Sequence, residues 1–176
     1  MTAEDALYYK ILLLSGYSPN VIMDKLDEDL EREDPLKDIT LALSFCKGNT
    51  DEIISCLNSF CRAHPADPYE VCRRLRTLIR DEYLSGEISE KEAADDFHLF
   101  ALSSETPFQP PWCQMDDVAN MYELAEFQDI DPAVFTEKFL SYIHDGTPVD
   151  ILPILQSRKR SKFSRIKTTI KRLFGR

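Results

Sequence analysis

Apolar residues recur along this chain at intervals of three and four, the spacing that places side chains on one face of an α-helix. No stretch of comparable length alternates polar and apolar residues as a half-buried strand does. We therefore predict an all-α fold, an irregular multi-helix bundle of eight or nine short helices. The apolar groups are Leu7, Ile11, Leu14; Val21, Ile22, Leu26, Leu30; Leu36, Ile39, Leu43; Ile53, Ile54, Leu57, Phe60; Val71, Leu75, Leu78, Ile79; Ala93, Phe97, Phe100, Ala101; Val118, Met121, Leu124, Ala125; and Val134, Phe135, Phe139, Ile143.

Helix starts are marked by pairs in which a residue with a side-chain oxygen precedes a proline. The oxygen can accept a hydrogen bond from a free N–H of the first turn, and proline suits the first helical position because it has no N–H to satisfy. Glycines at 16, 48, 86 and 146 fall where the preceding helices should end. The five pairs are Ser18-Pro19, Asp34-Pro35, Asp67-Pro68, Asp131-Pro132 and Thr147-Pro148.

The spacing of the helices leaves an alternative fold. The early starts come about 16 residues apart, so helical hairpins would repeat at about 33 residues, a period typical of stacked helical arrays. The hairpins share no residue pattern, however, and the later spacings differ. The bundle is the first prediction, and a short α-solenoid of helical hairpins is the alternative.

Charge divides the chain at about residue 157. The sequence holds 31 acidic and 21 basic side chains, but residues 157–176 contain nine Lys or Arg and no acid. We predict an acidic helical domain over 1–156 and a basic tail over 157–176. Such asymmetry bears on association with partners or membranes rather than on the fold.

The basic tail has the pattern of an amphipathic helix. Its apolar residues would gather on one side of a helix, with the cations flanking and opposing them, as in helices that lie on an anionic membrane or dock in a partner's groove. Self-docking on the acidic body is a further alternative. The predicted docking residues are Arg158, Lys159, Arg160, Lys162, Phe163, Arg165, Ile166, Lys167, Ile170, Lys171, Arg172, Leu173 and Phe174.

The acidic domain favours a basic protein partner. We do not expect nucleic acid, because the acidic body would be repelled by phosphate. The candidate contacts are Asp27, Glu28, Glu31, Asp116 and Asp117.

A proline-rich connection offers a second candidate surface. Residues 103–112 hold three prolines, together with Phe108 and Trp112, the only tryptophan of the chain. Both aromatic residues could recognise a partner. The alternative is that they pack under the loop and fix it to the core.

Local motifs for catalysis are missing. All five glycines are isolated, so no phosphate-binding loop exists, and no serine lies in a nucleophile elbow. The sequence therefore predicts no enzyme, no metal and no cofactor. The alternative is a helical metal-dependent hydrolase that uses His98, His144 and nearby carboxylates. Asp95 and His98 are three residues apart, a spacing that places two metal ligands on one face of a helix. A di-iron bundle needs that spacing twice, and the sequence has it once.

Five cysteines at irregular spacing argue against a disulfide framework and agree with a reducing compartment. The N-terminal residues include no basic leader, and the apolar run 11–14 is too short for a membrane span. We expect a cytoplasmic protein, with peripheral association at the inner face of the membrane as the role of the tail. The leading hypothesis is a non-catalytic interaction module, one version being an immunity-type or inhibitor protein that neutralises a basic partner.

Overall fold

A computed structural model describes residues 1–151 and 153, and within them it confirms the all-α fold. The predicted tail, 157–176, lies outside the described residues. The part of the chain that is described forms eight helices. They are α1 (Ala3–Leu14), α2 (Asn20–Arg32), α3 (Asp38–Phe45), α4 (Thr50–Ala63), α5 (Pro68–Ser85), α6 (Glu90–Ser103), α7 (Trp112–Glu126) and α8 (Pro132–Asp145).

Several predicted caps are present with the expected hydrogen bonds. The carboxylates of Asp67 and Asp131 accept from the backbone N–H groups two residues later, each at 2.9 Å, and a proline occupies the first helical position in both helices. Outside the five pairs, Ser89 and Glu92 form a reciprocal capping box at the start of α6. These starts follow from local chemistry alone, which is why the sequence predicts them well.

Two predicted starts are wrong. No helix begins at Asp34-Pro35. Helix α3 starts at Asp38, and just before it the Lys37 N–H donates to the Glu33 carboxylate at 3.1 Å. Residues 147–151 are not helical either. The N–H and hydroxyl of Thr147 both donate to the preceding Asp145 carboxylate, so Thr147 caps no new helix.

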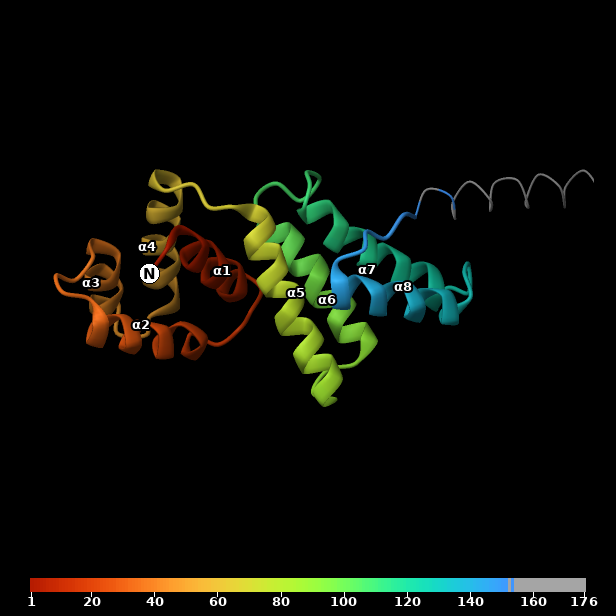
Figure 1. Cartoon of the computed structure of the whole chain (residues 1–176), viewed down its shortest axis with the longest axis horizontal. Coiled ribbons are helices and arrows are strands. Elements are labelled where there is room, and N and C mark those ends of the chain that lie inside the picture. Colours follow the sequence, from red (N-terminus) through yellow and green to blue (C-terminus); the bar gives the residue numbers. More distant parts are fainter. Residues whose placement is uncertain (152, 154–176) are drawn as a thin grey trace, which may run out of the picture.

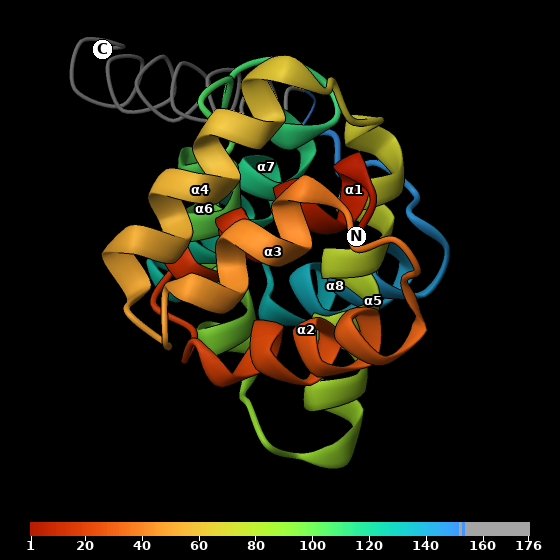
Figure 2. The same ribbon diagram turned by 90° about the vertical axis from the view of Figure 1, so that its left-hand side faces the viewer.

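The helices enclose two hydrophobic clusters, one on each side of α1. Helices α2–α4 lie to one side of α1 and α5–α8 to the other (Figure 1), and the view in Figure 2 has α2, α3 and α4 in front. We call them the N-terminal cluster (buried Met1, Ala6, Leu13, Ile22, Leu26, Ile39, Leu43, Cys46, Ile53 and Leu57) and the C-terminal cluster (20 buried residues, of which 19 lie in α1 and α5–α8 and the last is Val149).

Helix α1 belongs to both clusters. Ile11 and Leu12 are part of the C-terminal cluster, whereas Ala6 and Leu13 are part of the N-terminal one. Helix α1 therefore presents apolar residues to both clusters and not along a single stripe. The predicted stripe is wrong in placing Leu14 in the core, because Leu14 is 44% exposed. Since α1 packs on α4, α5 and α6, the fold is a bundle and not a solenoid, in which each repeat contacts only its neighbours.

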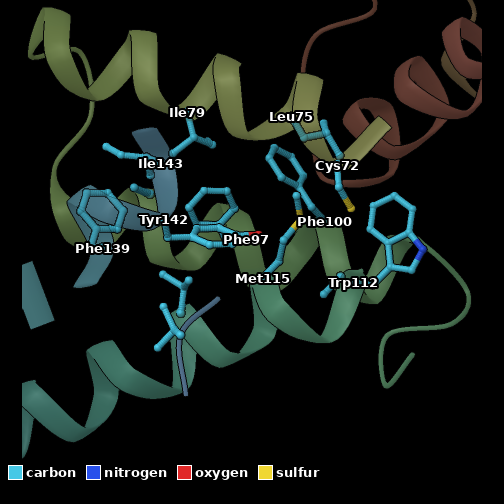
Figure 3. Close-up of a cluster of buried hydrophobic side chains, with 14 of the residues drawn as sticks. Cys72, Leu75, Ile79, Phe97, Phe100, Trp112, Met115, Phe139, Tyr142 and Ile143 are labelled. Atoms are coloured by element: carbon cyan, nitrogen blue, oxygen red, sulfur yellow. The ribbon is translucent and has the colours of Figure 1, made fainter. Parts of the chain in front are cut away.

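Aromatic rings fill the C-terminal cluster (Figure 3). The rings of Phe97 on α6 and Tyr142 on α8 meet edge to face, with centroids 5.3 Å apart, and Phe135 stacks on Phe139 at 5.6 Å. Edge-to-face and offset pairs are the favoured geometries for aromatic contacts. This cluster holds α6, α7 and α8 together and so positions the surface groove that α6 and α7 form.

A cluster of charged groups lies at the N-terminal cluster, around the ammonium group of Met1. The Met1 ammonium lies 2.7 Å from Asp29 Oδ2 and 2.9 Å from Glu33 Oε1, both on or next to α2. Lys25 pairs with Asp29 and Lys37 pairs with Glu33. Burial works to raise the pKa of Glu33, but hydrogen bonds from the ammonium and from Lys37 outweigh it, so that pKa lies well below its ordinary value. The pKa of Asp29 is lowered against burial in the same way.

We expect Glu33→Gln to lower the free energy of unfolding at pH 7 by about 1–3 kcal/mol, as hydrogen bonds to charged groups are lost. A lowered carboxyl pKa gives stability that is present above the unfolded-state pKa and is lost as the pH falls through the folded-state value. The difference in free energy of unfolding between the variant and the natural chain should therefore shrink below about pH 4. Urea denaturation at several pH values measures it. Glu31→Gln, on the exposed side of α2, is the control, and a pH-independent difference for Glu33→Gln would contradict the ion cluster.

Candidate interaction groove

Helices α6 and α7 enclose a small polar groove with a volume of about 120 Å³. Ala94 and Ala119 line its floor, where short side chains let the two helices approach closely. The groove is otherwise lined by charged and polar side chains that rise from both helices. They include Lys91, Asp95, His98, Asn120, Glu123 and Glu126.

The helical repeat explains why these residues share one groove. Lys91, Asp95 and His98 follow each other at intervals of four and three on α6, and Asp116, Asn120 and Glu123 do the same on α7. That spacing puts each set on one face of its helix. The core faces of the same helices carry Phe97 and Met121, among others, so packing of those faces sets the two polar faces side by side.

A histidine is fixed at one side of the groove. His98 Nδ1 lies 2.8 Å from Asp116 Oδ1, and Asn120 Nδ2 donates to the other oxygen of the same carboxylate at 3.0 Å. Asp116 thus bridges α6 and α7 and orients the imidazole ring. Because Nδ1 faces Asp116, Nε2 is directed away from it and is available to a ligand.

The groove is negatively charged. Lys91 is the one lysine or arginine of its lining, and its Nζ lies 3.4 Å from Asp95 Oδ2. The carboxylate of Asp95, and more weakly that of Glu126, raises the pKa of Lys91, so the lysine stays protonated. Asp95, Glu123, Glu126 and the bridging Asp116 outnumber this single cation. Such an arrangement suits an ammonium or guanidinium group of a bound partner.

The negative potential continues along α7. Burial raises the pKa of Asp117, and the neighbouring charges of Asp116 and Asp150 raise it further. The Asp117 carboxylate therefore lies close enough to both neighbours for their charges to disfavour its ionised form.

The five predicted acidic contacts do not form one surface. Asp116 and Asp117 lie on α7, at or beside the groove, whereas Asp27, Glu28 and Glu31 lie on α2 at the other side of α1 (Figure 1). Asp27 and Glu31 are exposed, but Glu28 is paired with Lys25 and Arg32. The sequence could not show this separation, since it does not specify where α2 packs.

The proline-rich connection separates its two aromatic residues. Trp112 is only 3% exposed and is part of the C-terminal cluster, which corrects the prediction that it presents surface to a partner. Phe108 is 84% exposed, so it remains a candidate contact. Glu105 fixes the loop to α1 through an ion pair with the buried Lys10 at 2.5 Å.

Metal-binding groups do not assemble among residues 1–151 and 153. No group of three or more His, Cys, Asp or Glu side chains there could hold an ion. His98 forms a hydrogen bond with Asp116, and His144 lies in the last turn of α8. The described residues therefore do not build the centre that the metal-dependent alternative requires.

Some groove residues escape sequence reasoning. Asn120, Glu123 and Glu126 match no motif, and the only signal is the interval of four and three that they share with Asp116. That interval also occurs on many solvated helix faces. Its meaning depends on which helix packs beside it.

Comparisons with protein-family models, curated proteins and solved structures find no match to this chain. The fold and the groove therefore define its class by themselves: a small all-α protein with an acidic interhelical groove. In the described part, no helix combines the length and the apolar character that crossing a membrane requires.

Proposed function

We propose that this protein is a non-catalytic interaction module whose α6/α7 groove binds a basic segment of a partner protein. The observation that supports this most directly is the set of four carboxylates at the groove with a single lysine among them. Exposed ion pairs contribute about 0.2–1 kcal/mol each, so a lone contact would not hold a partner. Several contacts in one groove can, and their field also speeds the encounter.

Exposed apolar side chains can add to this contact. Phe108, on the loop that leads into α7, is 84% exposed, and aromatic side chains are enriched in protein interfaces. A partner that carries both cations and an apolar residue would suit these two features. An immunity-type or inhibitor protein that covers a basic active site is the specific version of this proposal.

The basic tail supplies a second docking element, on the evidence of its sequence. Cations near an anionic surface contribute about 1 kcal/mol each, and large apolar side chains add to this when they are half-buried. For a tail that is disordered when free, ordering a dozen residues would oppose binding at about 1–1.5 kcal/mol per residue. These opposing contributions nearly cancel, so we expect the tail to attach reversibly to an anionic membrane or to a partner's groove. In a cytoplasmic protein, that membrane surface would be the inner face.

We expect the full chain to co-sediment with phosphatidylserine vesicles at low salt and to be released at high salt. Screening explains the salt effect, because the Debye length falls from about 10 Å at 0.1 M salt to 3 Å at 1 M. Neutral phosphatidylcholine vesicles and a chain ending at Gln156 are the controls. Equal binding to neutral vesicles, or by the shortened chain, would contradict membrane docking by the tail.

The groove is tested separately, with a labelled basic peptide that has the sequence of residues 157–176. The peptide is titrated into a chain that ends at Gln156, so that no tethered tail competes for the site. Binding that weakens when the groove carboxylates are neutralised supports the proposal. Binding that is unaffected by the groove overturns it.

A further inference from the structure

Two cysteines meet at the junction of α3 and α4. Cys46 follows the last residue of α3, Cys56 lies in α4, and their Sγ atoms are 3.7 Å apart. Cys46 is buried, while Cys56 is half-buried at the edge of the N-terminal cluster. We propose that Cys46 and Cys56 form a site of reversible oxidation, at which a peroxide converts the two thiols to a disulfide.

The connection between the helices holds the pair in place. The Asn49 N–H donates to the Cys46 carbonyl at 2.8 Å, and the Asn49 side chain caps α4. Lys47 and Gly48 both adopt positive φ, which gives a tight turn. The two sulfurs are thus brought together by the backbone and not by chance rotation of long side chains.

The remaining movement is small. A disulfide bond is about 2.0 Å long, so the sulfurs must approach by roughly 1.7 Å. Rotation about the Cα–Cβ bond of either cysteine moves its sulfur by a distance of this order. At present Cys46 Sγ contacts the Ala42 carbonyl at 3.4 Å, a weak hydrogen bond that costs little to break.

The chemistry balances with hydrogen peroxide as the oxidant. The half-buried Cys56 thiolate attacks one peroxide oxygen, the O–O bond breaks, and the products are a Cys56 sulfenic acid and, after protonation, water. The Cys46 sulfur then displaces the sulfenic hydroxyl, forming the S–S bond and releasing a second water. The two sulfurs lose two electrons to the peroxide, and a thiol reductant reverses the change by exchange.

The surroundings of Cys46 set the speed of the reaction. Burial raises the pKa of Cys46 to about 11, and the neighbouring Cys56 adds to this rise. The thiolate is the reactive form, so ring closure is slow at neutral pH and should accelerate by about tenfold per pH unit between pH 7 and 9.

The test is peptide mapping of the full chain after exposure to hydrogen peroxide under folding conditions. Remaining thiols are alkylated and the chain is digested without reduction. We expect the free thiols to fall from five to three, a linked peptide that joins Cys46 to Cys56, and recovery of all the thiols with dithiothreitol. Cys46→Ala and Cys56→Ala should each lower formation of an intramolecular disulfide at least tenfold.

Cys61→Ala, a change in the same helix five residues beyond Cys56, is the matched control and should leave the linked peptide unchanged. Circular dichroism of each variant verifies that it is folded. Five free thiols after prolonged oxidant, or a disulfide between Cys72 and Cys113 in place of the predicted one, would overturn the proposal. Equal linkage in unfolded chain would also overturn it, because the folded geometry would then contribute nothing.

Discussion

Replacing Phe97 with alanine should lower the free energy of unfolding by about 3–5 kcal/mol, the usual cost of removing a buried aromatic ring. Phe97 is fully buried in the C-terminal cluster, and its ring meets Tyr142 edge to face (Figure 3). The substitution removes that contact and leaves a cavity between α6 and α8. Because domains of this kind are stable by only about 5–15 kcal/mol, the variant should unfold at a clearly lower urea concentration.

Leu99→Ala is the matched control for this prediction. Leu99 lies two residues along the same helix and is 40% exposed, so its loss should cost less than about 1 kcal/mol. Both changes leave helix propensity favourable, since alanine is the best helix former. Similar losses of stability in the two variants would contradict the position of the core face of α6.

The fold was predictable where short-range rules decide it. Asp67, Ser89 and Asp131 begin helices because their side chains satisfy the first N–H groups, and Gly86 and Gly146 end helices in the left-handed conformation that favours glycine. These effects depend on residues only a few positions apart. The sequence therefore predicts most helices and their order.

Long-range packing explains the errors. Leu12 and Leu13 face opposite clusters because α1 lies between two sets of helices, and no single stripe could indicate this. Helix α3 starts at Asp38 and not at the predicted Asp34-Pro35, and the preceding Glu33 contacts the Met1 ammonium, 32 residues away in the sequence. Such contacts are set by the tertiary arrangement.

The groove shows the same limit. The sequence assigns His98 to a metal-dependent alternative and Asp116 to an acidic contact set, yet the structure joins them by a hydrogen bond of 2.8 Å between two helices. Each helix carries polar residues spaced by four and three, which the sequence shows. The groove forms only because α6 packs beside α7, which the sequence does not show. The charge of the body was predictable, while the place where the charge gathers was not.

Neutralising the groove should weaken binding of the basic peptide by about tenfold or more. The variant carries Asp95→Asn, Glu123→Gln and Glu126→Gln, which keep the side-chain shapes and remove three charges. Three surface contacts of about 0.5–1 kcal/mol each correspond to roughly tenfold or more in Kd. The Asp116 bridge to His98 is left intact, so the arrangement of α6 and α7 should not change.

A second variant separates a local site from the overall charge. Asp24→Asn, Asp27→Asn and Glu31→Gln remove the same number of charges from the exposed face of α2, on the other side of α1. Long-range attraction falls equally in both variants because their net charges are identical. A difference in peptide affinity between the two variants would therefore indicate a local binding site in the groove.

The most direct measurement is a fluorescence titration of the labelled peptide, with the sequence of residues 157–176, into three forms of the chain ending at Gln156: unchanged, groove variant and α2 variant. Circular dichroism first verifies equal helix content. We predict a Kd at least about tenfold higher for the groove variant and within about twofold of the unchanged chain for the α2 variant. Equal weakening by both variants, or no weakening by the groove variant, would contradict a binding site between α6 and α7.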